Sequence, residues 1–208
     1  MNDCKTVADI VERFVNGKVL MLQKSYLAGS SSSRATLARL RRLGQPGMGS
    51  WMVVGDDVFS GLPELCTSRV DEEDALRAIR CAMKLYAIHQ QSEVVGVAIP
   101  PSSMDWTSGS FGRACYLISH QVGSEPQGEA GVLRRMSTIE SATGFEGVEA
   151  GLRALISLMK SKGVKLNYGR LARDIYFIQK SSARDRVFMG WARDYYVPRK
   201  QDACDTSN

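Results

Sequence analysis

Arginine is the residue type in this sequence with the clearest capacity to bind a ligand. Arg34, Arg39, Arg41 and Arg42 fall within residues 34–42, a segment that contains no acidic residue. A guanidinium group keeps its charge at any relevant pH and binds phosphate oxygens through paired hydrogen bonds. A helix that starts at the serines just before this segment would add amide donors. The segment therefore predicts a phosphate-binding surface, although an ordinary solvated helix face would have the same composition.

Positive charge is also concentrated in the C-terminal part of the chain. The 208 residues carry a net formal charge of +5, but residues 132–200 alone contain fourteen Lys or Arg and six Asp or Glu, a net of +8. Charge sorted in this way favours a polyanionic partner such as a nucleic acid. The N-terminus lacks the pattern of a signal peptide, and no apolar run is long enough to span a bilayer. We therefore expect a cytoplasmic protein without a membrane partner.

Motifs for catalysis are missing from the sequence. There is no GxxxxGK[ST] phosphate loop and no GxSxG nucleophile elbow. His89 and His120 stand outside any acid–base pattern, and the five scattered cysteines favour free thiols over a zinc site. The acids at residues 71–74 diverge around a helix start, while Asp56 and Asp57 are typical of a turn. We expect no catalytic residue, no metal site and no cofactor.

Apolar residues at helical spacing predict helices along most of the chain. Ser33, Asp71 and Asn167 are the expected N-caps of three of them, and Gly17 is expected to interrupt the first. A short strand over residues 94–99 would have no partner. The expected helices cover residues 6–15, 19–27, 34–43, 71–90, 110–120, 129–141 and 146–162, followed by a pair within residues 166–197.

A weakly patterned segment with prolines and serines, residues 91–110, lies between the two halves of the chain. Exposed segments of this composition are typical of domain boundaries. The fold class that follows is all-α, in the form of two packed helical bundles. The N-terminal bundle, with the arginine-rich helix, is expected over residues 1–100 and the C-terminal bundle over residues 101–208.

The last pair of helices is rich in aromatic residues. Most of them repeat at helical spacing along one stripe per helix, which predicts that they are buried in the core. Phe177 and Tyr196 lie off these stripes and would be available to stack on nucleic-acid bases. Two helices joined by a polar turn would also suit a helix-turn-helix regulator, but its second helix would need exposed polar residues to read bases. A hydrolase without a recognisable motif is the remaining alternative.

Five motifs occur in an order that resembles a known family. They are SSSSRATLARLRR at residues 30–42, FGRA at 111–114, VLRRM at 132–136, LNYGRLARDIYFI at 166–178 and RVFMGWARDYY at 186–196. The set is similar to CasB, the small subunit of the type I-E CRISPR complex Cascade. The resemblance covers the C-terminal half well and the N-terminal half mainly through the arginine segment. Residues 51–70 and 91–106 match no motif.

The resemblance implies two all-α bundles without catalytic activity, acting in antiviral defence. Family members contact crRNA and target DNA when the R-loop opens. They form a pair of copies along the complex and touch CasC-like backbone subunits and the CasA-like large subunit. The family's basic surface would map onto Arg34, Arg39, Arg41, Arg42, Arg113, Arg134 and Arg135, and further onto Lys160, Lys162, Arg170 and Arg173.

Overall fold

The computed structural model describes residues 6–43, 51–101, 109–120 and 126–197. These residues contain no strand, only an isolated parallel bridge between Ala98 and Leu166, so the expected all-α class is confirmed. The helices in the described ranges are α1 (Val7–Leu27), α2 (Ser31–Arg41), α3 (Trp51–Phe59), α4 (Arg69–Gln90), α5 (Phe111–His120), α6 (Pro126–Ser141), α7 (Phe145–Ser161), α8 (Tyr168–Ile178) and α9 (Ser181–Tyr196).

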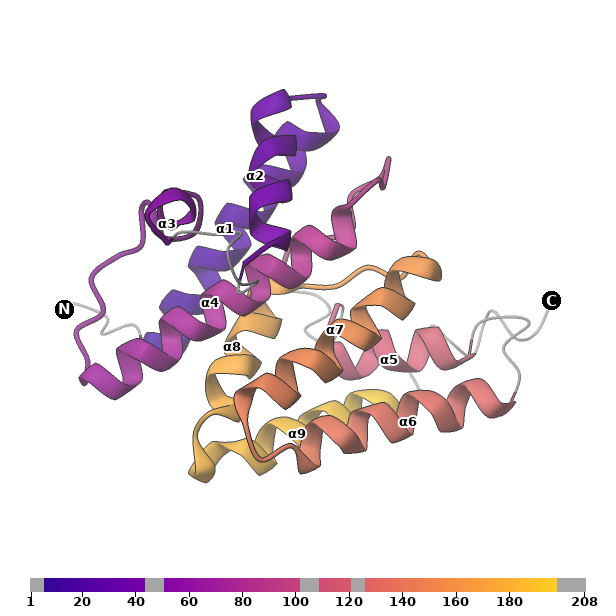
Figure 1. Ribbon diagram of the computed structural model, residues 1–208. Coiled ribbons are helices and arrows are strands. Elements are labelled where there is room, and N and C mark those ends of the chain that lie inside the picture. The colour runs from indigo at the N-terminus through magenta and orange to yellow at the C-terminus, as the bar shows by residue number, and fades with distance from the viewer. Residues whose placement is uncertain (1–5, 44–50, 102–108, 121–125, 198–208) are drawn as a thin grey trace.

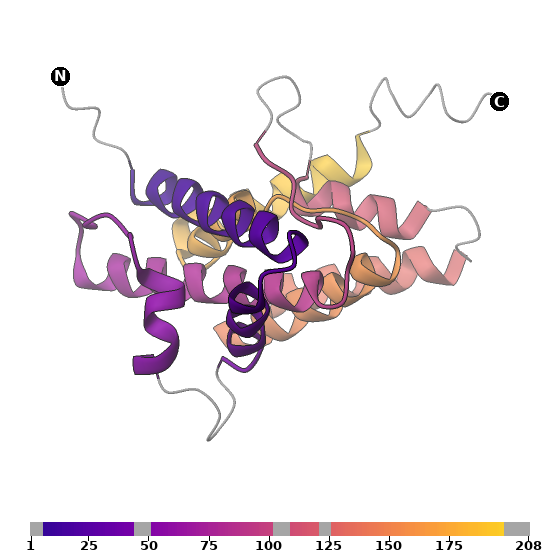
Figure 2. The same ribbon diagram turned by 90° about the horizontal axis from the view of Figure 1, so that it is seen from above.

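The helices form two groups that share a common core. Helices α1 to α3 lie towards one end of the molecule, and α5, α6 and α9 lie towards the other, as Figures 1 and 2 both show. Helix α4 runs between the groups and packs against α1, α2, α7 and α8. The buried apolar residues of both groups belong to one continuous cluster. Within the described residues, no helix is both long and apolar enough to cross a membrane.

Helix α8 belongs to the C-terminal half by sequence but packs mainly against α1 and α4. The contact with α1 is made possible by Gly169, because a Cβ at this position would lie 2.4 Å from the carbonyl oxygen of Glu12. The Gly169 amide also donates a hydrogen bond to Oδ1 of Asn16, at 3.2 Å. The division into residues 1–100 and 101–208 stays a prediction, and α8 packs across the expected boundary against helices of the N-terminal half.

Two of the three expected N-caps are wrong by a few residues. The side chain of Ser30, not Ser33, accepts a hydrogen bond from the first turn of α2, and Ser68 rather than Asp71 caps α4. Each true cap is a serine whose hydroxyl accepts from the amide three residues later. Asn167 is the cap of α8 as predicted, accepting from the amide of Arg170 at 2.9 Å.

Three further expectations about local structure are wrong. Helix α1 continues through Gly17, since the burial of Val15 and Val19 on either side stabilises the helix more than one glycine weakens it. Asp56 and Asp57 lie within α3 and not in a turn. The segment expected to be a strand without a partner has one, since the amide of Ile99 donates to the carbonyl of Leu166 at 3.0 Å.

The aromatic stripes of α8 and α9 are buried, as their spacing predicts. Tyr168, Trp191 and Tyr195 are almost fully enclosed, and Tyr176 and Phe188 are buried as well. Phe177 is only partly buried, and Tyr196 is 63% exposed. The two aromatic residues that lie off the stripes are therefore the ones that reach the surface.

Candidate nucleic-acid interface

The arginines of α2 are presented on the surface by a helix that buries Leu37 and Leu40. Arg34 and Arg42 are exposed and Arg41 is half-buried. Because Arg34 and Arg41 are seven residues apart, they project from the same side of the helix. Among the described residues, these three guanidinium groups have no acidic partner. They are therefore available to an external anion.

Arg39 on the same helix has a structural role that the sequence did not reveal. Its Nε lies 2.7 Å from Oδ2 of Asp57 and its Nη2 lies 3.0 Å from Oδ1, which makes a two-pronged ion pair between α2 and α3. Thr36 also donates to this carboxylate, at 2.9 Å. Although burial disfavours the charged form, the hydrogen bonds from Arg39 and Thr36 lower the pKa of Asp57 below its usual value.

The two arginines of α6 lie on a separate part of the surface. Arg134 is exposed, whereas Arg135 folds back so that its Nη1 donates to the carbonyl of Gly131 at 2.9 Å. Helix α6 packs against α5 and α7, while α2 packs against α1, α3 and α4. Figure 1 shows the two helices well apart. The arginines of α2 and α6 therefore form two patches, and one ligand would reach both only if it were extended.

Arg113 is enclosed by the fold and does not lie on the surface. Arg113 is 5% exposed, and its guanidinium group lies 4.4 Å from the centre of the Tyr116 ring. Its neighbour Gly112 allows α5 to touch α9, because a Cβ there would lie 2.1 Å from the carbonyl oxygen of Trp191. The FGRA motif therefore serves helix packing in this structure.

The two lysines at the end of α7 differ in their surroundings. Lys160 reaches the C-terminal end of α4, where its ammonium group donates to the carbonyls of Gln91 and, at 3.4 Å, Ile88. A cation at that position satisfies carbonyl groups that have no partner within the helix. Lys162 is exposed. Lys160 joins α7 to the end of α4, so the exposed Lys162 is the better surface candidate of the pair.

Arg170 and Arg173 each tie α8 to a neighbouring helix. Arg170 pairs with Asp194 of α9 at 2.9 Å, and the side chain of Asp194 is 1% exposed. Arg173 pairs with Asp9 and Glu12 of α1, at 3.3 and 3.0 Å. These ion pairs hold three helices together and leave less of either guanidinium group for an outside partner.

A second link joins the two C-terminal motifs. The indole nitrogen of Trp191 donates to Oδ2 of Asp174 at 2.7 Å. Loss of water around the Asp174 carboxyl raises its pKa to about 6, although this hydrogen bond and the nearby Arg170 act in the opposite direction. The motifs at residues 166–178 and 186–196 are thus complementary to each other, with one ion pair and one hydrogen bond running between them.

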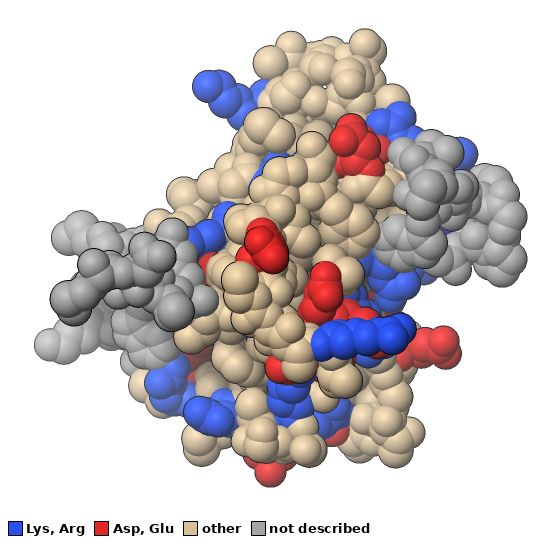
Figure 3. Space-filling model, turned by 90° about the vertical axis from the view of Figure 1, so that its left-hand side faces the viewer, with Lys and Arg blue, Asp and Glu red and all other residues tan. Residues whose placement is uncertain are grey.

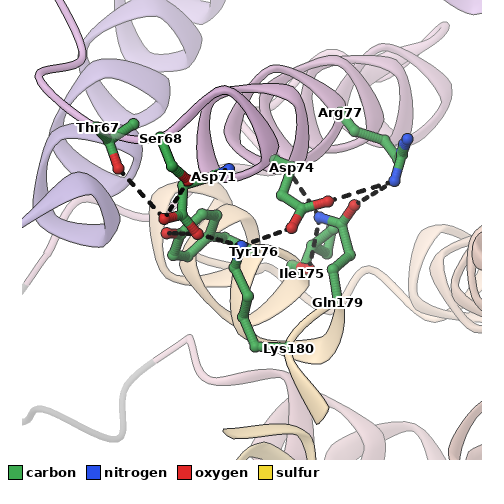
Figure 4. Close-up of polar contacts among 9 residues, drawn as sticks. All are labelled: Thr67, Ser68, Asp71, Asp74, Arg77, Ile175, Tyr176, Gln179 and Lys180. Carbon is green, nitrogen blue, oxygen red and sulfur yellow. Dashed lines mark hydrogen bonds and ion pairs between the residues drawn. The ribbon is translucent and has the colours of Figure 1, made fainter. Parts of the chain in front are cut away.

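Lys180, between α8 and α9, binds two acids near the start of α4. The sequence predicted these acids at a helix start. Figure 4 shows the Lys180 ammonium group between Asp71 and Asp74. Its Nζ lies 2.6 Å from Oδ2 of Asp74. The hydrogen bond from Lys180, followed by that from Ser68, lowers the pKa of Asp71. Gln179 adds a hydrogen bond to the carbonyl of Asp74 at 2.9 Å. These acids therefore neutralise a cation of the protein itself.

Basic and acidic side chains alternate on part of the surface. On the side shown in Figure 3, Lys and Arg are interspersed with Asp and Glu and do not form a continuous basic field. The described residues contain no group of three or more His, Cys, Asp or Glu side chains that could hold a metal ion. On this side of the molecule, the basic side chains are therefore limited to separate patches.

Comparisons with known proteins agree with this architecture. The family model of the CRISPR-associated protein Cse2 (CRISPR_cse2) matches residues 36–196. The crystal structure of CasB from Thermobifida fusca superposes with a TM-score of 0.71 and 24% sequence identity, covering 90% of this chain and 98% of that one. No curated protein sequence matches the chain significantly. The chain therefore belongs to the family of the CRISPR-associated protein Cse2, the Cascade subunits that its sequence motifs resemble.

Proposed function

We propose that this protein is the non-catalytic small subunit of a type I-E Cascade complex and holds the backbones of crRNA and target DNA in the cytoplasm of a prokaryote. The observation that carries this proposal is the match to the Cse2 family, together with exposed α2 arginines that have no acidic partner among the described residues. CasC-like backbone subunits, a CasA-like large subunit and a second copy of this chain are the proposed protein partners.

The physical task of such a subunit requires phosphate contacts more than base recognition. In RNA-guided complexes, base pairing with the guide supplies the sequence specificity, and exchange of one duplex for the other is nearly balanced in free energy. A few charge-assisted contacts to the opened strands are then enough to favour the R-loop. Arg34, Arg41 and Arg42 supply such contacts in this proposal, with Arg134 and Lys162 as separate sites along the strands.

The remaining basic residues have a structural role in this proposal. They are Arg39, Arg113, Arg135, Lys160, Arg170 and Arg173. Their charged groups are engaged within the fold or enclosed by it. We therefore assign them to positioning the helices and not to direct contact with phosphates. No observation favours a helix-turn-helix regulator, because α9 buries Phe188, Trp191 and Tyr195 in the core.

The experiment that tests the proposal compares two double variants in reconstituted complexes. In the first, Arg34→Glu and Arg42→Glu reverse the charge of the α2 patch. In the second, Arg13→Glu and Arg69→Glu make the same change in net charge at exposed positions on α1 and α4. Complex composition, melting temperature and affinity for a matched target duplex are measured for both.

The proposal expects the α2 variant to assemble and melt normally but to bind the target more weakly than the control variant. The difference in target affinity between the α2 variant and the control variant should decrease as salt concentration rises, because phosphate contacts contribute less when counterions are abundant. Equal target affinity for the two variants, in complexes of the same composition, would remove the α2 patch from the proposed function. Incubation with labelled DNA and RNA and divalent metal ions tests the expected absence of nuclease activity.

A further inference from the structure

A pocket of about 290 Å³ opens between α8 and α9, away from the arginine patch of α2. Two aromatic residues, Phe177 and Trp191, line it together with Arg173, Asp174 and Arg186. Gly190 forms part of its wall, and a Cβ at that position would meet no atom within 4 Å. The pocket is therefore open at this wall, and its volume suits a ligand no larger than about one nucleotide.

Some charged groups around this pocket have partners within the described residues and others do not. Arg170 and Arg173 are paired with acids of α9 and α1. Arg186 is exposed, and no described residue forms an ion pair with it. Asp174 uses Oδ2 to accept from Trp191, while its Oδ1 has no hydrogen-bond donor among the described residues. One cation and one acceptor oxygen thus remain for a ligand.

The aromatic side chain of Phe177 indicates what shape of ligand would fit the pocket. Phe177 lies off the buried stripe of α8, and the guanidinium group of Arg173 lies 5.8 Å from its ring centre. A flat ring that entered past Gly190 could stack on Phe177. A bare phosphate would contact Arg186 but would leave Phe177 unused and would be repelled by Asp174. The complementary ligand has a planar body, N–H donors on its edge and a negative group.

We propose that this pocket holds one unstacked nucleotide of the strand that the protein binds, with its base on Phe177, its donor edge at Asp174 and its phosphate at Arg186. Extruded bases are recognised in this way, by stacking between apolar side chains and hydrogen bonds to the base edge. The inference rests on the proposed function, because it adds a base contact to a protein that otherwise holds backbones.

The test measures affinity of the full chain for short single-stranded DNA with bases and for abasic DNA of the same length. RNA of the same sequence forms a parallel arm, which identifies the strand that supplies the base. Phe177→Leu keeps an apolar side chain for packing but removes the aromatic face. Gly190→Leu fills the pocket without changing any charge, and Leu117→Ala is a control that removes an exposed apolar side chain outside the pocket.

The proposal expects wild-type protein to prefer strands with bases over abasic strands. Because stacking contributes about 1–3 kcal/mol per base, Phe177→Leu should weaken binding to strands with bases by roughly 5- to 150-fold, with little effect on abasic strands. Gly190→Leu should act in the same direction, and Arg186→Gln should weaken both ligands.

Two outcomes would overturn the inference, and they differ from a failure of the proposed function. Equal wild-type affinity for both kinds of strand would show that no base is bound. The same conclusion follows if Phe177→Leu and Gly190→Leu behave like Leu117→Ala in proteins with normal melting temperatures. If wild-type protein binds neither strand and the α2 charge reversal leaves the complex unaffected, backbone binding itself is wrong.

Discussion

Gly169 offers a direct test of how the two halves of the molecule are joined. In Gly169→Ala, the new methyl group would lie 2.2 Å from Nδ2 of Asn16 and 2.4 Å from the carbonyl oxygen of Glu12. Both separations are more than about 1 Å shorter than the carbon contact optimum of about 3.5–4.0 Å. The Asn16 side chain can turn away, but the Glu12 oxygen belongs to the backbone of α1, so the two helices must separate.

The size of the effect follows from known costs of overpacking. Forcing an extra carbon into a packed contact costs about 1–3 kcal/mol. For a chain of this length, each kcal/mol shifts the melting temperature by about 2–4 °C. We therefore expect Gly169→Ala to lower Tm by about 2–12 °C, measured by circular dichroism at fixed pH and salt.

Gly17→Ala is the matched control, because it makes the same substitution within α1. Gly17 is exposed, and a Cβ there would meet no atom within 4 Å. Alanine is favoured over glycine by about 1 kcal/mol within a helix, so this variant should melt about 2–4 °C higher than wild type. A Gly169→Ala protein that is as stable as Gly17→Ala would refute the close packing of α8 on α1.

Three further predictions concern charged groups. Arg39→Glu should lower Tm because it places a second acid beside Asp57, whereas Arg42→Glu should leave Tm nearly unchanged; equal melting of the two variants would contradict the α2–α3 ion pair. Lys180→Met should lower Tm by several degrees, because Asp71 and Asp74 are left to repel each other. Arg69→Met removes the exposed Arg69–Glu73 pair and should leave Tm nearly unchanged. The pKa of Asp174 is raised from 3.8 to about 6 in the folded protein. As pH falls, the folded protein therefore binds this proton before the unfolded protein does, so the contribution of Asp174 to stability falls as pH rises from about 4 to 6. Tm profiles over that window should therefore differ in slope between wild type and Asp174→Asn, and parallel profiles would show that the Asp174 pKa is not raised.

The helices were largely predictable from sequence because their apolar faces repeat at helical spacing. Helix α3 was missed, since Gly55 and two aspartates weaken its pattern and the burial of Val54 and Val58 stabilises it only through neighbouring helices. The caps of α2 and α4 were misplaced because several nearby residues could serve, and only the backbone geometry selects Ser30 and Ser68.

The candidate site was harder to predict, because charge in the sequence does not reveal pairing in space. Arg39 and Arg42 are alike in sequence, but only Arg39 faces Asp57, which lies on the helix that was not predicted. The motif arginines Arg170 and Arg173 were expected to bind nucleic acid, and the sequence did not reveal that they also form ion pairs with neighbouring helices. Residue periodicity can place a side chain on a helix face, but it cannot say which neighbouring helix that face meets.

The salt dependence of target binding tests the proposed phosphate contacts of the α2 arginines most directly. Reconstituted complexes with wild-type small subunit are compared with complexes carrying Arg34→Gln, Arg41→Gln and Arg42→Gln together. Each lost phosphate contact should reduce the slope of log affinity against log salt by about one, so we expect a slope smaller by about three. An unchanged slope, in complexes of normal composition, would contradict the claim that these arginines hold nucleic-acid backbones.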